Sequence, residues 1–196
     1  MVKALSFLAV LALFGCDGGK EVEQNIPGKK ILMIIASSNF RDEEYQEPRQ
    51  ILEGAGAEIT VASSSLDLAK GVLGATAKPD ILITDVKVTD YDAVLFIGGG
   101  GSRQYFDDID AHWIARQAVG EEKILGGICS AVSILANAGV LKGKRATAFS
   151  SEGPNLRAKG ANYTGAAVEI DGKIITANGP QSATKFGQAI LEALAE

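Results

Sequence analysis

Cys129 lies in the pentapeptide Gly-Ile-Cys-Ser-Ala, residues 127–131, between an apolar stretch of strand length and a helix-like stretch. This pattern is typical of a nucleophile elbow, in which a strand turns sharply into a helix and small flanking residues let the backbone pass. At such a helix N-terminus, the helix dipole and free backbone N–H groups favour the thiolate over the thiol. The pattern therefore predicts a reactive cysteine. The alternative is a buried cysteine that packs as a small hydrophobic side chain.

Alternating strands and helices are expected to position this elbow. Strands are predicted at residues 30–36, 58–62, 91–97, 123–128 and 146–149, and helices at 41–54, 110–119, 132–139 and 181–195. Such alternation predicts an α/β fold with a mostly parallel sheet, in which sites form at the carboxyl ends of the strands. Residues 39–44, the glycines after Ile97 and the elbow all arrive at that edge.

Three local features refine this prediction. Asp171-Gly172 joins two short apolar segments, residues 168–170 and 173–176, and is a strong signal for a two-residue hairpin. Short alternating pieces between residues 71 and 88 indicate a small antiparallel excursion. Proline is tolerated only in the first turn of a helix, so the helix around Pro48 is expected to begin near Glu44 or Tyr45.

Length and composition indicate one globular domain. The chain has 196 residues, 46% of them hydrophobic, and a formal net charge of −5. It contains no cluster of lysine and arginine, so nucleic acid is not an expected partner.

The first residues are similar to a bacterial lipoprotein signal. Lys3 precedes an apolar run at residues 4–14, which is too short to span a bilayer. Gly15-Cys16 follows and is similar to a lipobox, although Phe14 departs from the small residue usual there. We therefore expect a signal segment at 1–16, a flexible tether at 17–29 and an α/β domain at 30–196.

This assignment predicts an extracytoplasmic protein anchored in the membrane through lipid on Cys16. A secreted or periplasmic protein with an ordinary secretory signal, and an uncleaved anchor, are the alternatives. With Cys16 lipidated, Cys129 has no partner for an internal disulfide, so its oxidation state becomes a functional question.

Four segments together carry a family resemblance. They are residues 42–48 with a glutamate four residues before proline, residues 96–100, the elbow at 127–131 and Asn178-Gly179-Pro180. In this order and spacing they resemble the PfpI/DJ-one superfamily, which shares its flavodoxin-like three-layer sandwich with the class I glutamine amidotransferases. The resemblance extends from Lys30 nearly to the C-terminus and implies a homodimer or larger homo-oligomer.

The resemblance also implies roles for individual residues. Glu44 matches the glutamate that hydrogen-bonds the cysteine and should be protonated, so that its O–H favours the thiolate of Cys129. Gly100 and Ser130 match the two positions whose backbone N–H groups face the sulfur or an oxyanion formed there. Without the resemblance, Glu44 is better explained as an acidic residue attracted to a helix N-terminus.

Two departures from the family pattern concern histidine. The protease-like branch has histidine directly after the nucleophile, where this chain has Ser130, and the deglycase-like branch has histidine where this chain has Phe149. The single histidine, His112, is expected to be a surface or half-buried helix residue. A Cys–His hydrolase needs a base beside the sulfur, and one histidine with one free cysteine is too little for an ordinary zinc site. We expect no metal and no cofactor.

These observations favour a reactive-cysteine protein in which Cys129, supported by Glu44, reacts with oxidants or small electrophiles such as reactive aldehydes. Any glyoxalase-like or deglycase-like turnover is expected to be slow without histidine. The alternative is a non-catalytic extracytoplasmic module that acts in redox sensing, as a chaperone or in binding. A cysteine hydrolase that takes its base from a neighbouring subunit is the least favoured hypothesis.

Overall fold

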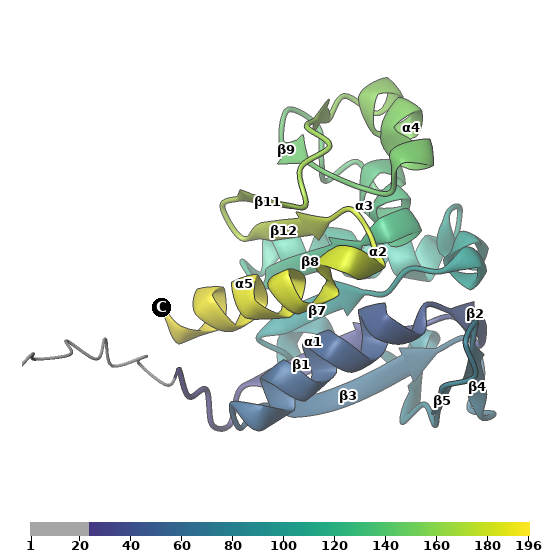
Figure 1. Cartoon of the computed structure of the whole chain (residues 1–196), viewed down its shortest axis with the longest axis vertical. Coiled ribbons are helices and arrows are strands. Elements are labelled where there is room, and N and C mark those ends of the chain that lie inside the picture. Colours follow the sequence, from purple (N-terminus) through teal and green to yellow (C-terminus); the bar gives the residue numbers. More distant parts are fainter. Residues whose placement is uncertain (1–23) are drawn as a thin grey trace, which may run out of the picture.

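The computed structural model describes residues 24–196, which form an α/β fold of three layers (Figure 1). The signal segment predicted for residues 1–16 lies outside the described residues, as does most of the tether predicted for 17–29. Seven strands form the central sheet in the order β11-β12-β8-β7-β1-β3-β6. Their bounds are β1 Lys30–Ile34, β3 Glu58–Ser63, β6 Ile81–Leu82, β7 Ala93–Phe96, β8 Ile124–Ile128, β11 Val168–Asp171 and β12 Ile174–Ala177.

All neighbouring strands in this sheet are parallel except β11 and β12. These two form the hairpin predicted at Asp171-Gly172, and Gly172 has the positive φ of 62° that such a turn requires. The strand order and the flanking helices confirm the predicted flavodoxin-like sandwich with a mostly parallel sheet.

Side chains of β1 alternate between two hydrophobic cores. Leu32 and Ile34 pack in the core on one face of the sheet, whereas Ile31 and Met33 pack in the core on the other face. A strand buried on both faces needs apolar residues at every position, which explains the continuous apolar run. The helices are α1 Asp42–Gly54, α2 Ile109–Gly120, α3 Val132–Asn137, α4 Gly153–Ala158 and α5 Ala183–Ala195.

Pro48 lies inside α1, whose first residue is Asp42. The prediction that Pro48 occupies the first turn was therefore wrong. A Cβ added to Gly187 of α5 would lie 2.8 Å from the Cα of Pro48, so the two helices are in close backbone contact at this point. This tertiary packing offsets the intrahelical hydrogen bond that proline cannot donate.

A small second sheet begins directly after the first strand in the chain and includes the antiparallel pair of strands predicted between residues 71 and 88. It consists of β2 (Ser38–Phe40), β4 (Ala69–Gly71) and β5 (Thr76–Ala77), and only β4 and β5 are antiparallel. Two backbone N–H groups of the β4–β5 turn donate to the buried carboxylate of Asp42, at 2.8 and 2.7 Å. The later part of the predicted excursion instead forms β6 and pairs in parallel with β3.

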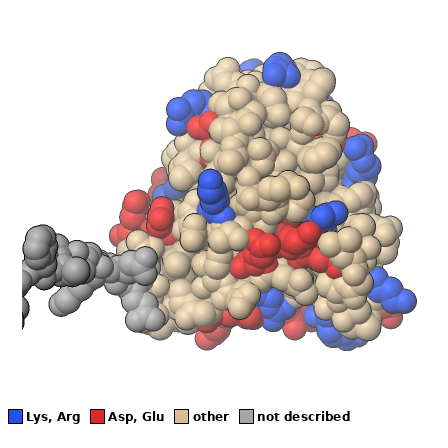
Figure 2. Space-filling view, viewed as in Figure 1, with Lys and Arg blue, Asp and Glu red and all other residues tan. Residues whose placement is uncertain are grey.

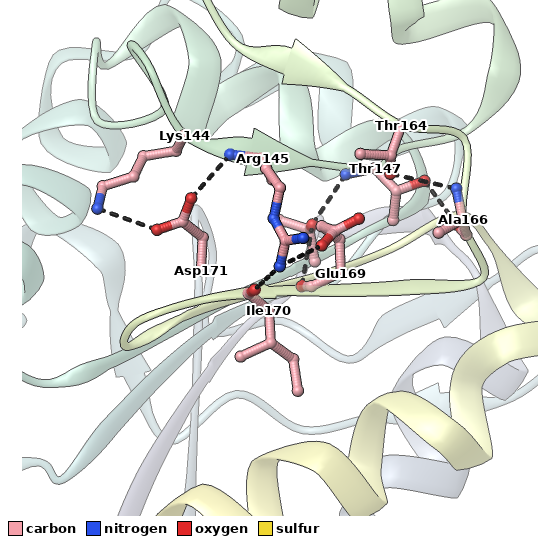
Figure 3. A network of polar contacts seen from close by, with 9 residues as sticks. Lys144, Arg145, Thr147, Thr164, Ala166, Glu169, Ile170 and Asp171 are labelled. Carbon is pink, nitrogen blue, oxygen red and sulfur yellow. Dashed lines mark hydrogen bonds and ion pairs between the residues drawn. The ribbon is translucent and has the colours of Figure 1, made fainter.

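A polar network attaches β9 (Arg145–Ala146) to the β11–β12 hairpin (Figure 3). The carboxylate of Asp171 accepts hydrogen bonds from Lys144 Nζ at 3.1 Å and from the Arg145 N–H at 2.9 Å. β9 pairs with β10 (Asn162–Tyr163), so the strand predicted at 146–149 is present only at its first residue. The network fixes the chain that leads to Phe149, a residue of the site described below.

The surface of the described residues carries mixed charge. On the face shown in Figure 2, lysine and arginine side chains are scattered singly, and they form no continuous basic area on that face. Within residues 24–196, none of the helices combines the length and the apolar character needed to cross a membrane.

Candidate functional site

Cys129 stands at the turn between β8 and α3, as the elbow pattern predicts. Its φ of +61° lies in the left-handed region, which non-glycine residues rarely adopt and which costs of the order of 1–3 kcal/mol. The residue is 9% exposed. Its backbone oxygen accepts a hydrogen bond from the Phe149 N–H at 3.3 Å. The sharp turn therefore holds the sulfur at the carboxyl end of β8, on the floor of a pocket.

Glu44 projects toward this cysteine from the first turn of α1. It is fully buried, and neither carboxyl oxygen has a hydrogen-bond partner at a favourable distance and angle. Gly98, after β7, lies between the two side chains: a Cβ there would be 2.5 Å from Glu44 Oε2 and 2.7 Å from Cys129 Cβ. Three segments distant in the sequence thus converge at this point, and only glycine fits between the acid and the thiol.

Burial raises the pKa of the Glu44 carboxyl to about 7, and a hydrogen bond with Cys129 and the charge of Arg41 partly oppose that rise. Burial and the charge of the Glu44 carboxylate raise the pKa of the Cys129 thiol to about 12. This direction is opposite to that expected from the helix N-terminus, because loss of water outweighs the dipole of the six-residue helix α3.

The two groups titrate as a pair. Near neutrality the pair loses its first proton, and the remaining proton is shared between the sulfur of Cys129 and the carboxylate of Glu44. Burial raises the pKa of both groups, so the apparent pKa values belong to the pair. A thiolate forms when that proton lies on Glu44, as the family resemblance implies, and the pKa of this carboxyl is about 7.

Two backbone N–H groups favour the thiolate form, those of Ser130 and Gly99. Ser130 was expected in this role, whereas the second donor was expected to be Gly100. The Gly98 carbonyl accepts a hydrogen bond from the Arg41 N–H at 3.0 Å, and this orients the following N–H, that of Gly99, toward the sulfur. Gly100 lines the same pocket, and its role as a donor stays a prediction.

The hydroxyl of Ser130 has a second function that its sequence position did not indicate. It donates to the Gly99 carbonyl at 3.0 Å, and Ser102 Oγ donates to the same oxygen at 2.9 Å. The two hydroxyl oxygens are 2.9 Å apart. Ser130 thus contributes a backbone donor to the sulfur and a side chain that holds the glycine loop in place.

The pocket over Cys129 has a volume of about 660 Å³. Its wall includes two arginines and a second buried carboxylate, Arg41, Arg103 and Glu152, none of which has a sequence motif. Phe149 also lines it, at the position for which the family resemblance implies a histidine. His112 is half-buried on α2, with Nε2 2.8 Å from the Phe106 carbonyl oxygen, and it does not line the pocket.

Within residues 24–196, no group of three histidine, cysteine, aspartate or glutamate side chains is arranged to hold a metal ion. The site therefore offers a thiol, a carboxyl group with a pKa of about 7 and two backbone donors. This arrangement can transfer a proton from sulfur, add the sulfur to an electrophile and stabilise negative charge on an oxygen next to it.

Comparison with known proteins shows the same fold and family. The model of the DJ-1/PfpI family matches residues 29–193. An uncharacterized protein of Methanocaldococcus jannaschii is 33% identical over 190 residues, 95% of this chain and 93% of the relative. A deglycase of Pyrococcus abyssi is 28% identical over 149 residues, 76% of this chain and 90% of the relative. The crystal structure of a ThiJ/PfpI domain protein from Brachyspira murdochii has a TM-score of 0.84 at 36% identity, covering 86% of this chain and 97% of the other.

Proposed function

Because this chain belongs to the DJ-1/PfpI family, we propose that it is a reactive-cysteine protein in which Cys129, assisted by Glu44, reacts with small electrophiles or oxidants. One observation carries the proposal: a fully buried carboxyl group without a complete hydrogen bond faces a cysteine on the floor of an open pocket. A charged group in that environment is costly unless it takes part in chemistry or is neutralised.

Addition to an aldehyde follows from this geometry. Ionised Glu44 accepts the thiol proton as the sulfur of Cys129 forms a bond with the carbonyl carbon. The carbonyl π electrons move to oxygen, where the N–H groups of Gly99 and Ser130 stabilise the charge. Glu44 then returns the proton to that oxygen, giving a hemithioacetal with no net change in protons or electrons. The relative named as a deglycase supports an aldehyde-type substrate.

Oxidation of the same sulfur is the second reaction that the site supports. Each equivalent of hydrogen peroxide transfers one oxygen atom to the sulfur and leaves as water, so two equivalents convert the thiol to sulfinic acid. The N–H groups of Gly99 and Ser130 would bind the sulfinate oxygens as they bind an oxyanion. The single cysteine among the described residues is free to react in this way.

The decisive experiment measures the rate of Cys129 alkylation against pH in the wild type and in Glu44→Gln. We expect the wild-type rate to show a step near pH 7, where Glu44 ionises, and the variant to lose that step. Peptide mass mapping separates Cys129 from Cys16, and Glu53→Gln, an exposed position on the same helix, is the matched control. An ordinary thiol profile in both proteins would refute the proposal.

A non-catalytic redox-sensing, chaperone or binding module is the second candidate. It is favoured by the phenylalanine at position 149 and by the raised pKa of the Cys129 thiol, both of which slow turnover. Methylglyoxal consumption by the wild type and by Cys129→Ser distinguishes the two. Consumption that disappears in the variant establishes an enzyme, whereas modification of Cys129 without turnover establishes the sensor.

We also propose that the protein is exported and anchored through lipid on Cys16, because Lys3, the apolar run and Gly15-Cys16 have lipoprotein proportions. Metabolic labelling with a fatty-acid analogue should mark the wild type and not Cys16→Ser. Labelling of neither protein would support an ordinary secretory signal. Size-exclusion chromatography with light scattering tests the expected dimer or larger assembly.

A further inference from the structure

Arg103 lines the same pocket as Glu44 and carries the opposite charge. It belongs to the 3₁₀ turn η3 (Gly100–Tyr105), directly after the glycine loop. Its guanidinium lies over the ring of Phe106, 5.2 Å from the centroid, and its Nη2 is 2.9 Å from Glu152 Oε1. The side chain is nevertheless 61% exposed. Arg103 is therefore held in place while it still faces the solvent of the pocket.

Glu152 has no role in the proposed chemistry of Cys129, but its carboxylate is buried and hydrogen-bonded in the wall of the pocket. Its side chain is 6% exposed. Oε2 accepts a hydrogen bond from Ser133 Oγ at 2.8 Å, and Oε1 accepts from Ser151 Oγ at 3.0 Å as well as from Arg103. A buried carboxylate with three donors is a rigid anchor. The structure thus uses this acid to fix the direction of one arginine.

The donors that remain on Arg103 differ from those on the other arginine of the pocket. Arg41 uses both Nε and Nη2 on the carboxylate of Glu43, at 2.8 and 2.9 Å. Within residues 24–196, Arg103 uses only Nη2, so its Nε and Nη1 donors are open. A guanidinium presents its N–H groups in a planar fork that matches a carboxylate.

The backbone that carries Arg103 is equally fixed. A Cβ on Gly101 would overlap the carbonyl oxygen of Ser38, so η3 packs directly against β2. The Ser102 hydroxyl holds the preceding loop through the Gly99 carbonyl. A preorganised arm of this kind binds a ligand with little loss of conformational entropy.

We propose that Arg103 is the specificity-determining residue of the pocket and binds a carboxylate on the substrate, so that Cys129 acts on small electrophiles that are also carboxylic acids. This inference rests on the proposed reactivity of Cys129. The lining of the pocket supports it, because Arg103 lines the same pocket as Cys129 and, among the described residues, its Nε and Nη1 donors are open.

Iodoacetate and iodoacetamide test this with one reaction. Both form a sulfur–carbon bond with Cys129 as the carbon–iodine bond breaks, iodide leaves with the bonding pair and the thiol proton passes to Glu44. The two reagents differ in that one has a carboxylate where the other has an amide. The ratio of their alkylation rates therefore isolates recognition of the carboxylate from reactivity of the thiol.

We expect the ratio of the iodoacetate rate to the iodoacetamide rate to fall about tenfold in Arg103→Gln. A fall of this size corresponds to the loss of one charge-assisted hydrogen bond. In Arg103→Lys the ratio should fall by a smaller factor, since lysine keeps the positive charge without the planar fork of N–H donors. Arg157→Gln is the matched control: Arg157 also lies over an aromatic ring, that of Tyr163 at 4.6 Å, but does not line the pocket. The control should keep the wild-type ratio.

The outcomes separate this inference from the proposed function. If neither reagent modifies Cys129 in the wild type, the reactive cysteine itself is refuted. If both reagents modify it and the ratio is the same in wild type, Arg103→Gln and Arg157→Gln, the cysteine is reactive and the role of Arg103 is refuted. Because Arg103 is largely exposed, the variant should fold, and circular dichroism verifies this.

Discussion

Glu44 and Glu152 are two buried carboxyl groups in the wall of one pocket, and they differ in their hydrogen bonds and in their neighbours. Glu152 accepts hydrogen bonds from two hydroxyls and a guanidinium. Glu44 has no complete hydrogen bond, and its near neighbours are a thiol and a glycine. Glu152 is fixed in position by these contacts, whereas the carboxyl of Glu44 has a pKa of about 7 and can exchange a proton near neutral pH.

This difference separates a structural use of a buried acid from a chemical one. A satisfied carboxylate stabilises the groups that bind it and positions them, as Glu152 does for Arg103. An unsatisfied carboxyl group has a raised pKa and lowers the stability of the fold when it ionises. The same residue type can therefore serve substrate binding on one side of a pocket and proton transfer on the other.

The largest expected effect is on stability in Glu44→Gln. The pKa of Glu44 is raised from 4.5 to about 7 in the folded state. The contribution of Glu44 to stability is therefore fully present below pH 4.5, and about 3 kcal/mol of it is lost as the pH rises through 7. Glutamine cannot ionise, so the variant should lack this loss and be the more stable protein at pH 8.

Urea denaturation at pH 5, 6, 7 and 8 measures this difference, with Glu53→Gln as the exposed control on the same helix. Other groups titrate alike in wild type and variant, so their contributions cancel in the comparison. Parallel stability curves for wild type and Glu44→Gln would show that Glu44 is not a strained acid and would remove the contrast with Glu152.

The sequence predicts local features of this fold well and long-range contacts poorly. The elbow at Cys129 and the hairpin at Gly172 follow from residue spacing within a few positions. Glu44 has the same local pattern as its acidic neighbours on α1, so only the family resemblance pointed to its place beside Cys129. Pro48 inside a helix depends on packing against α5, which no local rule contains.

Arg103 and Glu152 show why part of the site could not be predicted. They are 49 residues apart in the chain and meet because η3 packs against the turn at residues 129–131, while Ser133 of α3 binds Glu152. Neither residue lies in a motif that indicates a partner. The donor at Gly99, which was not predicted, has a similar origin, since a tertiary hydrogen bond from Arg41 sets the orientation of that peptide.

A methyl group at position 98 tests whether the contact between acid and thiol depends on glycine. The Cβ of Gly98→Ala would be 2.5 Å from Glu44 Oε2 and 2.7 Å from the Ile128 carbonyl oxygen. We expect a loss of about 1–3 kcal/mol in unfolding free energy, typical of overpacking. The step near pH 7 in Cys129 alkylation should move or disappear, because Glu44 must shift. An unchanged pH profile would mean that proton transfer does not need the observed contact.

Glu152→Gln should act in the opposite direction to Glu44→Gln. It removes the charge that holds Arg103 and should lower the free energy of unfolding by about 1–2 kcal/mol, a value reduced because Arg103 is largely exposed. Urea denaturation at pH 7 and 8 measures it. If glutamine stabilised the protein at both positions, the two carboxyl groups would be equivalent and the comparison would fail.

The smallest effects concern the two hydroxyls that satisfy Glu152. Ser133 is fully buried on α3 and Ser151 is exposed at the pocket rim, although their contacts with the carboxylate are similar, 2.8 and 3.0 Å. Ser133→Ala should cost about 1 kcal/mol in unfolding free energy, because water cannot replace the lost donor. Ser151→Ala should cost less than about 0.5 kcal/mol, since water can take its place. Equal costs measured by urea denaturation would show that the carboxylate is wetter than its burial indicates, and it would then be a weaker anchor for Arg103.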